Sequence, residues 1–91
     1  MTQAKRPRRI LVAEPEPTIS ETLREFLNHI GYEADLADNR EDVLSKVAEN
    51  ACQVVVLDHL LNSSVDGDLL DELRSMDPSI CVIMLISFPL V

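Results

Sequence analysis

Two carboxylates stand where apolar runs of the sequence end. Asp58 follows Val54–Leu57, and Glu14 follows Ile10–Ala13. A short, wholly apolar run is typical of a strand buried on both faces, as in a parallel sheet covered by helices. Because the carboxyl ends of parallel strands open into one crevice, we expect Asp58 and Glu14 to lie close together there. The alternative is that they occupy separate solvated loops, with Asp58 merely starting a turn or capping the next helix.

Such a pair of acids suits one kind of chemistry. Carboxylate oxygens are ligands for a hard divalent cation such as Mg²⁺, and Glu16 stands close to Glu14 in the same segment. The ion would neutralise the acidic cluster and could help to bring a phosphoryl group to Asp58. A carboxylate can itself act as a nucleophile and form an acyl phosphate.

The elements that must position these acids alternate between strand and helix. We expect strands over residues 9–13, 32–37, 53–58 and 81–86, because each of these segments is apolar or alternating. Strands that alternate with helices predict an α/β fold with a doubly wound parallel sheet and right-handed crossovers. The segment 32–37 alternates apolar and polar residues, so it suits an edge of the sheet.

Local signals place the helices. Thr18 with Glu21 forms a capping-box pattern at the start of the first helix, and Gly31 follows its end. Asp38 or Asn39 can cap the second helix, and a loop over residues 62–64 precedes the third, which Asp77-Pro78 ends. The expected inner positions of the first and third helices are Ile19, Leu23, Phe26, Leu27 and Ile30, then Leu69, Leu70 and Leu73.

Composition and charge narrow the class of protein. With 91 residues, 46% hydrophobic, the chain is long enough for one domain, and no apolar run approaches the roughly 20 residues that span a bilayer. We expect a soluble, cytoplasmic protein. Residues 1–9 form a basic arm, whereas residues 10–91 hold only four basic side chains and all sixteen acidic ones. Such a body should bind neither nucleic acid nor an anionic membrane.

Read in order, the segments resemble the receiver domain of response regulators in two-component signalling. The resemblance rests on Ile10–Pro17, Gly31–Ala34, Val54–Asp58, Leu69–Arg74 and Pro78–Leu85. It implies a flavodoxin-like topology with strand order 2-1-3-4-5, here incomplete after the fourth strand. It also implies that Asp58 is the phosphoacceptor, that Glu14 and Asp58 bind Mg²⁺ through their side chains, and that Leu60 does so through its backbone carbonyl. The implied partner is a histidine kinase or phosphotransfer protein, and the chain itself is not expected to be an enzyme.

Several positions depart from that family pattern. The first loop usually has two adjacent acids, and here Pro15 follows Glu14. Ile86 stands where the family has Thr or Ser, with Ser87 one residue later. Asn62 replaces a proline and Asp66 a glycine. We also expect residues 10–91 to be a truncated receiver-like domain, because no fifth strand with its lysine follows.

These departures leave a second function open. The chain can be a phosphorylation-independent interaction or dimerisation module derived from a receiver. Residues 82–86 would form an apolar strand edge followed by Phe88–Val91, a pattern that favours homo-oligomers through strand pairing or exchange of the C-terminal segment. The alternative is a fragment of a longer protein that is unstable alone.

Two other functions, one enzymatic and one cofactor-binding, fit the sequence less well. Phosphatases of the haloacid dehalogenase type need a second Asp two residues after the nucleophile, and here that residue is Leu60. A flavodoxin-like FMN site needs a phosphate-binding loop after the first strand, and Glu14-Pro15-Glu16-Pro17 would repel a phosphate. His59, beside Asp58, either tunes the acceptor or simply faces solvent.

Overall fold

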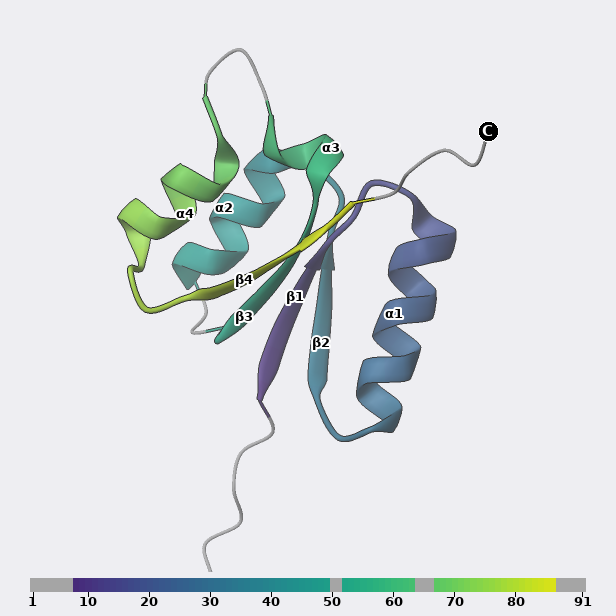
Figure 1. The fold of residues 1–91 in the computed structure, drawn as a ribbon. Helices are drawn as coiled ribbons and strands as arrows, with labels where there is room; N and C mark the ends of the chain where they lie inside the picture. Colours follow the sequence, from purple (N-terminus) through teal and green to yellow (C-terminus); the bar gives the residue numbers. More distant parts are fainter. Residues whose placement is uncertain (1–7, 50–51, 64–66, 87–91) are drawn as a thin grey trace, which may run out of the picture.

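Strands and helices alternate along the chain in the computed structural model, which describes residues 8–49, 52–63 and 67–86 (Figure 1). The elements are β1 (Arg9–Ala13), α1 (Pro17–His29), β2 (Glu33–Ala37), α2 (Arg40–Glu49), β3 (Val54–Asp58), α3 (His59–Asn62), α4 (Leu69–Met76) and β4 (Cys81–Leu85). Arg9 is the first residue of β1, so it belongs to the sheet and not to the predicted basic arm. Residues 1–7 of that arm lie outside the described residues.

The four described strands form one parallel sheet in the order β2-β1-β3-β4. The predicted doubly wound α/β fold is confirmed, and β2 lies at an edge as its alternating sequence indicated. Ala13 pairs with Leu57 across β1 and β3, and Asp58 pairs with Leu85 across β3 and β4. This register brings the carboxyl ends of β1, β3 and β4 to one edge of the sheet.

One face of the sheet is covered by α2, α3 and α4, and of the described helices only α1 lies on the other face (Figure 1). The main core lies on the face with three helices. Its largest side chains are less than 2% exposed and include Leu11, Val55, Leu57, Leu69 and Leu73. Each fully buried aliphatic side chain of this size contributes about 1.5–3 kcal/mol to folding. The predicted inner face of the third helix is confirmed at Leu69 and Leu73, while Leu70 is half-buried.

The prediction for the inner face of the first helix is partly wrong. Leu23 and Leu27 are half-buried, but Ile19, Phe26 and Ile30 are 46%, 58% and 51% exposed. The reason is tertiary, because the contacts of α1 with the sheet fall mainly on β2 and β1. On β4, Val82 and Met84 pack against the main core, whereas Ile83 is 50% exposed.

The start of α1 also differs from the prediction. Glu16, and not Thr18, is the N-cap, and its carboxylate accepts the Thr18 N–H at 3.4 Å. Pro17 occupies the first turn, where its missing N–H costs no helical hydrogen bond. Thr18 is therefore already inside the helix, and the expected capping box does not form.

Other predicted helix ends are confirmed. Gly31 has φ +105° just after α1, and the N–H of Tyr32 donates to the Leu27 carbonyl at 3.0 Å, which closes a Schellman motif. Asn39 caps α2 by accepting the Asp42 N–H at 2.8 Å. The sequence did not predict α3, a helix of four residues. No helix in the part of the chain that the structure describes is long and apolar enough to cross a membrane.

Candidate functional site

Asp58 lies at the carboxyl edge of the sheet and is only 7% exposed. It is the last residue of β3 and also the N-cap of α3, because its Oδ1 accepts the Leu60 N–H at 2.7 Å. The capping role considered from sequence is thus real. Asp58 caps α3 and is also buried at the end of β3, so the capping role does not exclude a functional role.

Glu14 follows β1 at the same edge and is 3% exposed. Its N–H donates to the Ala37 carbonyl at 3.0 Å, which holds this residue against the end of β2. Since Ala13 and Leu57 are register partners, Glu14 and Asp58 occupy equivalent next positions on neighbouring strands. The two carboxyl groups interact, because Asp58 raises the pKa of Glu14, so the two acids do not occupy separate solvated loops.

Proximity and burial raise the pKa of the Glu14 carboxyl. Loss of solvation is the largest cause, followed by the hydrogen bond with Asp58. The charges of Asp58 and Glu16 raise this pKa further, and the hydrogen bond from the Glu16 N–H, 3.3 Å from Glu14 Oε2, opposes the shift. Ionising both buried acids is therefore unfavourable, and a bound cation would offset the repulsion between their negative charges.

The residues at this edge fit a hard divalent cation. Their buried donors are carboxylate oxygens, the class that Mg²⁺ prefers. Glu16 is exposed and uses its carboxylate as the cap of α1. No group of three or more His, Cys, Asp or Glu side chains suited to a metal occurs within the described ranges. Of the expected ligands, the structure places the Glu14 and Asp58 carboxyl groups at this edge, and the role of the Leu60 carbonyl stays a prediction.

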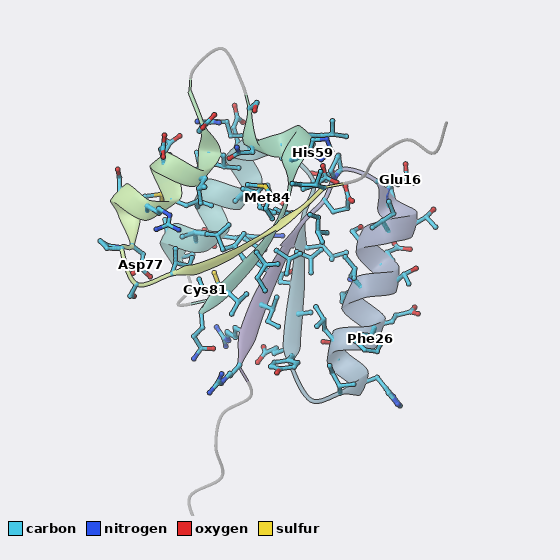
Figure 2. The ribbon with its side chains drawn as sticks, viewed as in Figure 1. Glu16, Phe26, His59, Asp77, Cys81 and Met84 are labelled. Atoms are coloured by element: carbon cyan, nitrogen blue, oxygen red, sulfur yellow. The ribbon has the colours of Figure 1, made fainter. Side chains whose placement is uncertain are left out.

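His59 links the acid to the neighbouring strand. Its Nδ1 lies 3.6 Å from Asp58 Oδ1 and 3.3 Å from the Leu85 carbonyl oxygen, and its side chain is 38% exposed. Figure 2 shows His59 at the carboxyl edge of the sheet, close to the end of β4. The sequence signalled His59 only through its position beside Asp58, and its contact with Leu85 depends on the β3–β4 register.

The positions that depart from the family pattern have local roles where the structure describes them. Asn62 Oδ1 accepts the Leu70 N–H at 2.9 Å, which fastens the end of α3 to the start of α4. Ile86 follows β4 and is 58% exposed. Ser87 and Asp66 lie outside the described residues, as does the apolar segment Phe88–Val91.

Comparison with known proteins agrees with this arrangement. The sequence profile of the family described as "Response regulator receiver domain" matches residues 10–88. The regulatory protein VanRB of Enterococcus faecalis is 33% identical over 76 residues, which cover 84% of this chain and 34% of VanRB. The chain thus spans about a third of the length of this curated relative.

Solved structures show the same fold. The response regulator protein TrrA of Thermotoga maritima, in complex with Mg²⁺-BeF, superposes with a TM-score of 0.74 and 33% identity, covering 89% of this chain and 70% of TrrA. A CheY-like receiver domain from Methanospirillum hungatei has a TM-score of 0.81 at 21% identity, covering 94% of this chain and 69% of its own. Together with the profile match, the four-stranded parallel order and the paired acids at its carboxyl edge, these similarities show that the chain belongs to the response regulator receiver domain family.

Proposed function

We propose that this receiver domain accepts a phosphoryl group on Asp58 in a two-component phosphorelay. The observation that carries the proposal is the buried Asp58 at the end of β3, beside the buried Glu14 at the end of β1. The similarity to response regulators supports the same role. The donor would be a phosphohistidine on a histidine kinase or phosphotransfer protein, and the chain itself would serve as acceptor and not as an enzyme.

The chemistry is an attack by one Asp58 carboxylate oxygen on the phosphorus of the donor. A new P–O bond forms, the P–N bond to the donor imidazole breaks, and its electron pair stays on the nitrogen, which takes up a proton. The hydrogen bond from the Leu60 N–H to Oδ1, at 2.7 Å, fixes the carboxylate for this attack. Mg²⁺, held by Glu14, Asp58 and the Leu60 carbonyl, would neutralise charge on the transferring phosphoryl group.

Intact mass after incubation with acetyl phosphate and Mg²⁺ tests this proposal. We expect the wild-type protein to gain one phosphoryl group, and the Asp58→Asn protein to gain none. Glu14→Gln should react more slowly, because it removes one of the two buried carboxylates. Asp71→Asn is a matched control, since it removes an exposed acid on α4 and should react like the wild type. A folded wild-type protein without adduct would contradict the proposal and favour the phosphorylation-independent interaction module.

A second proposal concerns self-association through β4. This strand has one neighbour, β3, among the described strands, and it exposes Ile83 and Cys81. An apolar strand at an edge of the described sheet can pair with another chain, and we propose a homodimer through β4. Sedimentation at micromolar concentration should show a dimer that Ile83→Lys dissociates, while Met76→Lys at the end of α4 leaves it intact. A wild-type monomer would refute this proposal and leave phosphorylation untouched.

A further inference from the structure

The Nδ1 atom of His59 faces two acceptors that belong to different strands. The Leu85 carbonyl oxygen of β4 is 3.3 Å away, and Asp58 Oδ1 of β3 is 3.6 Å away. A hydrogen bond to a carbonyl requires that Nδ1 carries its proton, and one N–H can serve only one acceptor well. In the unmodified protein the carbonyl is the closer partner, and Asp58 Oδ1 is already occupied by the Leu60 N–H at 2.7 Å.

A phosphoryl group on Asp58 would change this balance. It adds anionic oxygens to a carboxylate whose Oδ1 lies 3.6 Å from His59 Nδ1. Hydrogen bonds to anionic oxygens are shorter and about twice as strong as those between neutral groups. The imidazole is 38% exposed and retains room to move, whereas Asp58 is held between β3 and α3.

We propose that His59 moves its Nδ1–H from the Leu85 carbonyl to the phosphoryl group on Asp58, and so carries the modification state to the end of β4. This inference rests on the proposed phosphorylation of Asp58. It makes His59 a hydrogen-bond donor that helps to position the phosphoryl group. It also frees the Leu85 carbonyl just before Ile86, whose side chain is 58% exposed and available to a partner.

Three substitutions separate the hydrogen bond from the bulk of the side chain. His59→Asn places an amide N–H near the Nδ1 position, His59→Gln places it near Nε2, and His59→Ala removes it. His29→Ala is the matched control, because this histidine ends α1 and takes no part in the site. The acetyl phosphate reaction should be about tenfold slower for His59→Ala and His59→Gln, the effect of one hydrogen bond to a charged group. It should be near the wild-type rate for His59→Asn and His29→Ala.

A second measurement reports on β4 directly. The carbonyl ¹³C shift of Leu85 is followed by NMR while Mg²⁺ and beryllofluoride, a mimic of a phosphoryl group, are added. In the wild type and His59→Asn this signal should move. In His59→Ala it should already lie near the shifted position and stay there. If the wild type gains phosphate but His59→Ala reacts as fast and shows the same Leu85 shift, the His59 inference is overturned. If the wild type gains no phosphate, the proposed function fails first.

Discussion

Glu14 and Asp58 lie side by side at the carboxyl edge of the sheet, where they are only 3% and 7% exposed. The two acids come from strands that are neighbours in space but 44 positions apart in the chain. Their closeness follows from parallel pairing of β1 and β3 in one register. This closeness concentrates negative charge, which destabilises the folded protein when no cation is bound. The first two predictions follow from this electrostatic destabilisation.

Removing one of the two charges should stabilise the protein. In Asp58→Asn the side-chain oxygen can still accept the Leu60 N–H, while repulsion with Glu14 disappears. We expect the free energy of unfolding in Mg²⁺-free buffer at neutral pH to rise by on the order of 1 kcal/mol, measured by urea denaturation. Asp71→Asn makes the same charge change on the exposed side of α4 and should alter stability much less. A loss of stability in Asp58→Asn would contradict the prediction.

The stability of the metal-free protein should depend on pH through Glu14. The pKa of Glu14 in the folded state is raised from its ordinary value of 4.5. At pH values between 4.5 and the raised pKa, the native state therefore binds more protons than the unfolded state. The stabilisation is therefore fully present below about 4.5 and is lost as pH rises through the folded pKa. Glu14→Gln cannot titrate, so its advantage over the wild type should grow with pH and vanish in acid. Urea unfolding of both proteins across this range measures the difference, and a constant difference would disprove it.

The two cysteines should differ in reactivity. The structure buries Cys52 and exposes Cys81. Burial also raises the pKa of the Cys52 thiol, so less of the reactive thiolate forms. Alkylation at mildly basic pH should modify Cys81 rapidly in the folded protein. It should modify Cys52 only when the protein unfolds. The single variants Cys81→Ser and Cys52→Ser assign each rate, and equal rates would show that Cys52 is not protected.

Truncating a buried side chain should lower the free energy of unfolding more than truncating an exposed one on β4. Leu73 on α4 is fully buried, so Leu73→Ala should cost about 2–5 kcal/mol of unfolding free energy. Ile83 on β4 is 50% exposed, and Ile83→Ala should cost below about 1 kcal/mol in dilute solution, where chains are separate. Chemical denaturation measures both. Equal losses would mean that Ile83 is covered in solution.

The sheet and its acids could be predicted because they depend on simple rules. Apolar runs before Glu14 and Asp58 indicated buried strands, and parallel topology required their ends to meet. The end of α1 at Gly31 could be predicted because glycine readily adopts the left-handed conformation found there. In these cases one residue type or one period carries the whole signal.

The features that the sequence did not predict depend on two residues competing for one role or on contacts between distant strands. Glu16 and Thr18 are both able to cap a helix, and the fixed φ of Pro17 favours the earlier start. A helix of four residues, α3, is too short to show a period. The exposure of Phe26 depends on how far α1 covers the sheet, and the contact of His59 with Leu85 depends on register. No local pattern encodes either of these tertiary relationships.

Unequal covering of the sheet implies an order in which its strands come apart. β1 lies between β2 and β3, and its residues Ile10–Ala13 are buried. β4 has a single described neighbour and half-exposed side chains, so its amides can reach solvent through a small local opening. Amide hydrogen exchange should therefore be slower in β1 than in β4. Local opening of β4 would therefore expose the outer side of the strand that ends at Asp58 while β1 stays paired.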